Sequence, residues 1–126
     1  MKGKLIQNGV FLQKHEWKTI KVFLNQGKDI TLQPPNQSKN ERSADFWMDG
    51  VLWEMKSPQG KGKNTIHNII RKASHQSANI IIDLSRRKIP TEQVIDELEK
   101  EFALSKRIKR LKIVVDNNNV IDLNKK

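Results

Sequence analysis

Asp45, Glu54 and Lys56 have the residue types and the spacing for metal-assisted hydrolysis of a phosphodiester. Asp49-Gly50 separates two apolar runs, and this dipeptide favours a two-residue hairpin turn because both central residues need a positive φ. A turn at that point places Asp45 directly opposite Glu54, with Lys56 two residues further along the same face. The sequence therefore predicts two opposed carboxylates with an amine beside them.

Directly opposed like charges destabilise a sheet, so the pair predicts a cation between the two carboxylates. Mg²⁺ is a hard ion that one or two carboxylates hold together with water and substrate phosphate. Asp45 and Glu54 are thus the predicted metal ligands, and Lys56 would stabilise charge on the phosphoryl group. In the alternative, Lys56 neutralises one carboxylate on an ordinary solvated strand face. Trp47 borders this face either as a surface for base stacking or as a core residue.

A basic loop and helix follow Lys56 and form the second candidate region. Between Gly60 and Ser77 the chain has no acidic residue. The predicted nucleic-acid-binding residues are Lys61, Lys63, Asn64, Thr65, His67, Arg71, Lys72 and His75. His67, Arg71 and His75 would form one stripe, and the start of the helix would favour phosphate. Two alternatives remain open, a merely solvated helix face and histidines that act as acid and base in a metal-free ribonuclease.

Length and composition limit the class of protein. The chain has 126 residues, which predicts a single domain over residues 1–126, with 1–14 as a candidate peripheral segment. It has no cysteine, which excludes disulfides and thiol chemistry, and no apolar run long enough to span a membrane. The net charge is +10, and residues 1–90 hold 16 basic against 7 acidic side chains. Such a charge favours a polyanionic partner.

The hydrophobic pattern predicts an α/β fold, with a mixed sheet flanked by helices in the order αβββαβαββ. Helices are expected over 15–26, 64–77 and from Thr91 to a basic end near Arg107. Strands are expected over 29–33, 44–48, 51–56, 79–84, 111–115 and 120–123. The run of apolar residues at 79–84 is typical of a strand that is buried on both faces.

The motif Asp45, eight residues, then Glu54-Met55-Lys56 resembles the Asp…(Asp/Glu)-x-Lys signature of metal-dependent nucleases. That superfamily, with the PD-(D/E)xK or restriction-endonuclease-like core, has the element order αβββαβ, which residues 15–84 match. Ala44 stands where the signature has proline. The resemblance implies catalytic roles for Asp45, Glu54 and Lys56.

A wider resemblance covers about residues 40–123. It rests on Ala44-Asp45-Phe46, Asp49-Gly50, 53–58, Gly60, Thr65-Ile66, Ala73, Gln76-Ser77 and 79–84. This pattern resembles the C-terminal toxin domains of contact-dependent growth inhibition and other polymorphic toxin systems. The resemblance implies a bacterial nuclease, commonly a tRNase, that is exported as part of a larger protein, acts in the cytoplasm of a target cell and is neutralised by a cognate immunity protein.

The leading prediction is therefore a toxin-type endoribonuclease that cleaves RNA, most often tRNA, with Mg²⁺. The alternatives are a metal-independent RNase of the barnase–EndoU–colicin–RelE type, a DNA endonuclease and a non-catalytic nucleic-acid-binding module. The barnase-like alternative gives the main roles to Lys56, Thr65, His67 and His75. We expect an acidic immunity protein over the Asp45 face or the basic surface beside it, no membrane insertion, and a monomeric free domain.

Overall fold

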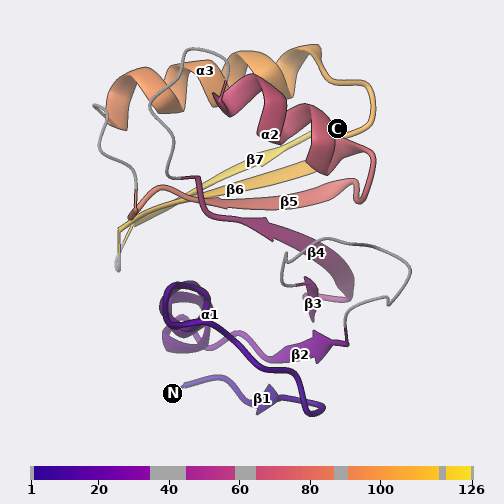
Figure 1. Cartoon of the computed structure of the whole chain (residues 1–126), viewed down its shortest axis with the longest axis vertical. Helices are drawn as coiled ribbons and strands as arrows, with labels where there is room; N and C mark the ends of the chain where they lie inside the picture. The colour runs from indigo at the N-terminus through magenta and orange to yellow at the C-terminus, as the bar shows by residue number, and fades with distance from the viewer. Residues whose placement is uncertain (1, 35–44, 59–64, 87–90, 117–118, 126) are drawn as a thin grey trace.

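The computed structural model describes residues 2–34, 45–58, 65–86, 91–116 and 119–125. In this part of the chain three helices flank a seven-stranded sheet (Figure 1). The helices are α1 (Lys14–Asn25), α2 (Thr65–Ser74) and α3 (Thr91–Leu104). The strands are β1 (Leu5–Ile6), β2 (Ile30–Gln33), β3 (Asp45–Met48), β4 (Val51–Lys56), β5 (Asn79–Asp83), β6 (Arg110–Asp116) and β7 (Asn119–Asn124). Among these elements, no helix has the length and apolar character that a lipid bilayer would demand.

The strands follow one another across the sheet in sequence order. β4, β5 and β6 run parallel, as do β1 and β2, whereas β3 is antiparallel to both of its neighbours and β7 is antiparallel to β6. The sheet is therefore mixed, and the predicted mixed α/β class is confirmed. The restriction-endonuclease-like core stays a prediction.

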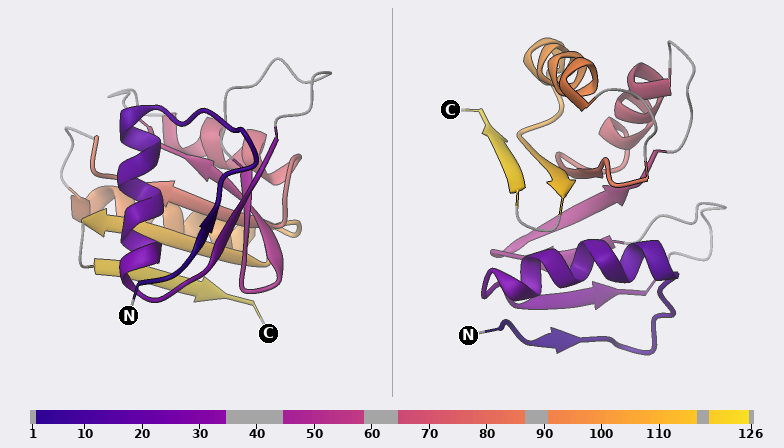
Figure 2. Two further views of the ribbon diagram at one scale, coloured as in Figure 1. Left: turned by 90° about the horizontal axis from the view of Figure 1, so that it is seen from below. Right: turned by 90° about the vertical axis from the view of Figure 1, so that its left-hand side faces the viewer.

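Helices cover both faces of the sheet, with α1 on one side and α2 and α3 on the other (Figure 2). Successive residues of β5 show the division. Ile81 packs in the cluster that includes Phe23 of α1, whereas Ile80 and Ile82 pack in the cluster that includes residues of α2 and α3. Because alternate side chains of a strand point to opposite faces, a strand between two helix layers is apolar throughout. This confirms the predicted doubly buried strand.

Two differences from the predicted elements lie near the ends of the chain. Leu5 and Ile6 form β1, a strand too short to show an alternating pattern, and Leu12 beyond it is buried. At the other difference, α3 ends at Leu104 rather than near Arg107. Ser105 Oγ accepts hydrogen bonds from the backbone N–H groups of Arg107 and Ile108 at 3.3 and 3.2 Å, and this local turn replaces the last helical turn.

Candidate active site

The β3–β4 hairpin has the predicted register. Asp49 and Gly50 both have a positive φ, of 55° and 78°. The ladder pairs Met48 with Val51 and, at its far end, Asp45 with Glu54. The turn chemistry of Asp49-Gly50 thus determines which side chains meet three residues away.

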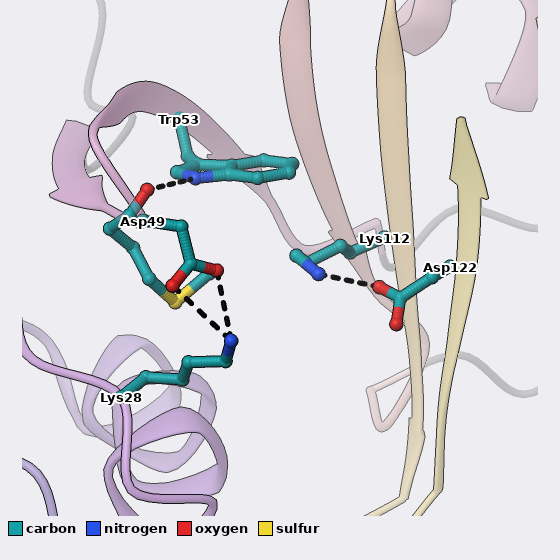
Figure 3. A network of polar contacts seen from close by, with 6 residues as sticks. Lys28, Asp49, Trp53, Lys112 and Asp122 are labelled. Atoms are coloured by element: carbon teal, nitrogen blue, oxygen red, sulfur yellow. Dashed lines mark hydrogen bonds and ion pairs between the residues drawn. The ribbon is translucent and has the colours of Figure 1, made fainter. Parts of the chain in front are cut away.

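Asp49 has a structural role at this turn. Its carboxylate forms an ion pair with Lys28, whose Nζ lies 3.1 Å from Asp49 Oδ2 (Figure 3). Trp53 Nε1 donates a 3.0 Å hydrogen bond to the Met48 carbonyl just before the turn. On the other side of the indole, Lys112 Nζ lies 5.2 Å from the ring centroid. These contacts hold the hairpin against the rest of the sheet.

Alternation along the hairpin separates an apolar face from a polar one. The buried side chains of the apolar face belong to Phe46, Met48, Trp53 and Met55, with Val51 partly buried beside them. This face packs against α1, as the sequence predicted. The polar face carries Asp45, Glu54 and Lys56, and it is the face on which α2 and α3 lie because Glu54 and Lys56 align with Ile80 and Ile82.

Glu54 is a buried carboxylate, with 3% of the residue exposed. Lys56 Nζ lies 3.4 Å from Glu54 Oε1, and the lysine side chain is 18% exposed. Within the described residues, Glu54 Oε1 accepts no hydrogen bond despite this ion pair. A buried carboxylate is costly unless it is paired, hydrogen-bonded or bound to a cation, so this oxygen is suited to a further ligand.

The donors fit a divalent ion of the magnesium type. Asp45 lies directly across the ladder from Glu54, so two hard carboxylate ligands are on neighbouring strands. The described residues contain no group of three or more acidic or histidine side chains arranged to hold a metal. An ion here would therefore depend on the two carboxylates and complete its shell with water and substrate oxygens, as Mg²⁺ commonly does.

The structure places the predicted binding residues of α2 in two directions. Thr65 begins the helix, and Ile66, Ile70 and Ala73 face the core. Arg71 and Lys72 are exposed. Lys61, Lys63 and Asn64 lie outside the described residues. The start of α2 and its exposed cations remain available to a phosphate backbone.

The two histidines of α2 and its end contact α3 and the segment after it. His67 Nδ1 lies 2.8 Å from Glu101 Oε1, and Arg107 Nη1 lies 2.6 Å from His75 Nδ1. α2 ends at Ser74, so His75 sits in the following turn rather than on the helical stripe that the sequence predicted. These contacts connect the histidines to the α3 side of the molecule instead of to Glu54.

Trp47 lies on the polar face of the hairpin, on the same side as Asp45 and separated from it by one residue. The residue is 43% exposed, so it is not a core residue. Its Nε1 donates a 3.1 Å hydrogen bond to Gln33 Oε1 on β2. The indole is therefore held in place while its surface stays accessible beside the carboxylates.

Asp83 is a buried acidic residue that the sequence analysis did not single out as a site residue. It is 1% exposed at the end of β5. Its carboxylate accepts hydrogen bonds from Thr19 Oγ1 of α1 and, at 2.8 Å, from the Ser85 backbone N–H. The signal in the sequence was an acidic residue directly after the apolar run of β5. Asp83 is on the α1 face and joins that helix to the sheet.

Comparisons with known proteins give matches at the levels of sequence family and fold. The profile of the family described as the contact-dependent growth inhibition CdiA C-terminal domain matches residues 42–120. Among solved structures, the fold is similar to a chain of the "CdiA-CT/CdiI toxin and immunity complex from Burkholderia pseudomallei". The TM-score is 0.66 at 14% sequence identity, over 98% of this chain and 100% of that chain. No curated protein sequence matches.

Proposed function

Because the chain belongs to the family of contact-dependent growth inhibition CdiA C-terminal domains, we propose that it is a toxin that cleaves the phosphodiester bonds of RNA. The observation that carries the proposal is the arrangement of Asp45, Glu54 and Lys56 on one face of the β3–β4 hairpin. Opposed carboxylates beside an amine are suited to phosphoryl chemistry and add nothing to the stability of a sheet.

In this mechanism Asp45 and Glu54 would hold a divalent ion through their carboxylate oxygens. A bound Mg²⁺ would supply an activated water and neutralise charge on the phosphoryl group. The Lys56 ammonium would donate to the phosphoryl oxygen that gains charge as water attacks the phosphorus. Backbone N–H groups in the first turn of α2, which begins at Thr65, would bind a neighbouring phosphate.

The choice of tRNA as substrate rests on the resemblance to toxin domains of the tRNase type. The cationic surface supports a polyanion in general, since it gives affinity for phosphate without reading base sequence. The exposed Trp47 adds a flat surface on which an unpaired base can stack. A stacking surface of this kind favours single-stranded segments of RNA over the interior of a DNA duplex.

The metal-independent alternative has less support from the contacts of the histidines. General acid and base groups must lie within hydrogen-bonding reach of the reacting atoms. His67 and His75 are instead in contact with Glu101 and Arg107. A purely binding module is also less well supported, because binding alone gives no reason to bury the Glu54 carboxylate opposite Asp45.

We also propose that a cognate acidic immunity protein binds the face that carries Asp45, Glu54 and Lys56 or the basic surface of α2. The support is charge complementarity with a chain of net charge +10. The toxin would be delivered as the C-terminal part of a larger exported bacterial protein and would act in the cytoplasm of the target cell.

The deciding experiment incubates the purified domain with total tRNA and with plasmid DNA, in Mg²⁺ or in EDTA. The variants are Glu54→Gln and Lys56→Ala, with Glu99→Gln and Lys100→Ala as controls of equal charge on the exposed side of α3. We expect Mg²⁺-dependent loss of tRNA with the wild type and both controls, and none with the two site variants. RNA cleavage that persists in EDTA would overturn the metal site, and cleavage of the plasmid alone would overturn the choice of RNA.

A further inference from the structure

A groove of about 560 Å³ lies on the α1 side of the sheet, on the opposite face from Glu54 and Lys56. Lys18, Lys21 and Asn25 of α1 line one side of it, and Ser85 and Asp116 line the other. Its size is within the range of pockets that hold a small organic ligand, such as one nucleotide unit.

The groove lies where a parallel sheet commonly binds ligands. Ser85 follows the carboxyl end of β5, and Asp116 ends the neighbouring parallel strand β6. Side chains beyond the carboxyl ends of parallel strands can converge on a ligand, because the chain leaves the sheet there and turns outward. In this protein α1 crosses that edge and closes the groove, anchored by the hydrogen bond from Thr19 to the buried Asp83.

The α1 wall of the groove is cationic. Lys14, Lys18, Lys21 and Asn25 follow one another at intervals of four, three and four residues, which places all of them on one exposed face of the helix. Within the described part of the chain, neither Lys18 nor Lys21 has an ion pair or a hydrogen bond to its ammonium group. Like charges at these spacings lower helix stability, so an anionic ligand would relieve a repulsion that folding leaves in place.

The opposite wall carries one carboxylate. Both oxygens of Asp116 accept hydrogen bonds from Asn119 Nδ2, at 2.9 and 2.8 Å. Asp116 is therefore engaged with the β6–β7 turn, and the lysines are left to a ligand. A bridging phosphate suits two ammonium groups on successive turns of a helix, with Asn25 as a further hydrogen-bond donor.

We propose that this groove binds a backbone phosphate of the nucleic-acid substrate, as an exosite on the face opposite the catalytic one. The proposal rests on the function proposed above. Lys56 aligns with Ile82, and Ser85 lies three residues further along β5. The groove is therefore displaced from the catalytic face by about 10 Å along the strands. A single strand that crosses the carboxyl edge of β4 and β5 reaches both places.

The test measures binding of short labelled single-stranded RNA and DNA to the Glu54→Gln chain, which cannot cleave them, across a range of salt concentrations. Lys18→Gln/Lys21→Gln removes the two groove charges. Lys100→Gln/Lys106→Gln removes two exposed charges on the α3 side as the matched control. Lys18→Arg/Lys21→Arg keeps the charge. Single-strand contacts contribute about 0.7 each to the slope of log affinity against log salt, so we expect the groove variant to lose about 1.4 of slope.

The proposal requires that the control pair leaves the slope nearly unchanged and that the arginine pair retains it. Equal losses for the groove and control pairs would overturn the exosite and leave the proposed nuclease intact. A groove variant that keeps RNA affinity but loses the immunity protein would assign the groove to that partner instead. Failure of every variant and of the parent to bind either probe would overturn the exosite together with the nucleic-acid substrate.

Discussion

Glu54 lies directly across the β3–β4 ladder from Asp45, although neither side chain contributes to the core of the sheet. Directly paired residues on antiparallel strands have Cβ atoms about 4.5–5.5 Å apart. A divalent ion between the two carboxylates would convert this repulsive pair into a binding site. The consequences can be measured for activity and for stability separately.

Glu54→Gln should abolish cleavage without unfolding the chain. The amide has the shape of the carboxylate but is a poor ligand for Mg²⁺, so the rate should fall at least about 100-fold, the upper end of the effect of altered support around a metal. Single-turnover cleavage of tRNA measures the rate, and circular dichroism checks the fold. A variant that stays within a few-fold of the wild-type rate would contradict a role for Glu54 as a metal ligand.

The double variant Glu54→Gln/Lys56→Met should fold at least as well as Glu54→Gln alone. Removing one partner of a largely buried ion pair leaves the other charge uncompensated, whereas replacing both can be neutral or stabilising. Urea unfolding of the two variants gives the comparison. If Lys56 serves catalysis, the double variant is inactive even though its free energy of unfolding is restored. Lower stability of the double variant would mean that Lys56 has structural contacts beyond Glu54.

Trp47→Ala should weaken binding of single-stranded RNA and leave stability almost unchanged. Stacking of one base on an aromatic side chain is worth about 1–3 kcal/mol, which corresponds to a loss of roughly 5- to 150-fold in affinity. Trp53 is the matched control, because it is buried and its substitution by alanine should instead cost about 3–5 kcal/mol of folding free energy. Trp47→Phe should retain most of the affinity. Equal affinity of Trp47→Ala and the wild type would remove the stacking surface from the proposal.

Asp83→Ala should destabilise the protein by about 1–3 kcal/mol, since it leaves the Thr19 hydroxyl and the Ser85 backbone N–H buried without their acceptor. Asp122→Ala is the control, because the Asp122 side chain is 52% exposed and its ion pair with Lys112 should contribute less than about 1 kcal/mol. Urea denaturation of both variants measures the difference. Similar values for the two would show that Asp83 does not anchor α1.

Gly50→Ala should cost about 1–2 kcal/mol, because Gly50 has a φ of 78° and a side chain there meets backbone strain. A Cβ at this position has no atom within 4 Å outside its chain neighbours, so crowding adds nothing. Asp49→Asn tolerates the same left-handed conformation and loses only the exposed ion pair with Lys28. Thermal unfolding of the two variants separates turn strain from the ion pair.

Local sequence patterns predicted most of the elements. The turn at Asp49-Gly50 determined the hairpin register, and the alternation of Phe46, Met48 and Trp53 determined which face is buried. β1 escaped prediction because two residues carry no period, and the end of α3 was predicted too late because the Ser105 side chain decides it. In the same way, the sequence brought His67, Arg71 and His75 into one stripe, but α2 ends before His75.

What the sequence determined by itself was the opposition of Asp45 and Glu54, since a two-residue turn sets cross-strand partners through local backbone geometry. Tertiary structure decided what surrounds that pair. The burial of Glu54, the exposure of Trp47 and the contact of His67 with Glu101 all depend on which helix covers which part of the sheet. Contacts of this kind join residues far apart in the chain, so no local period or turn signal encodes them.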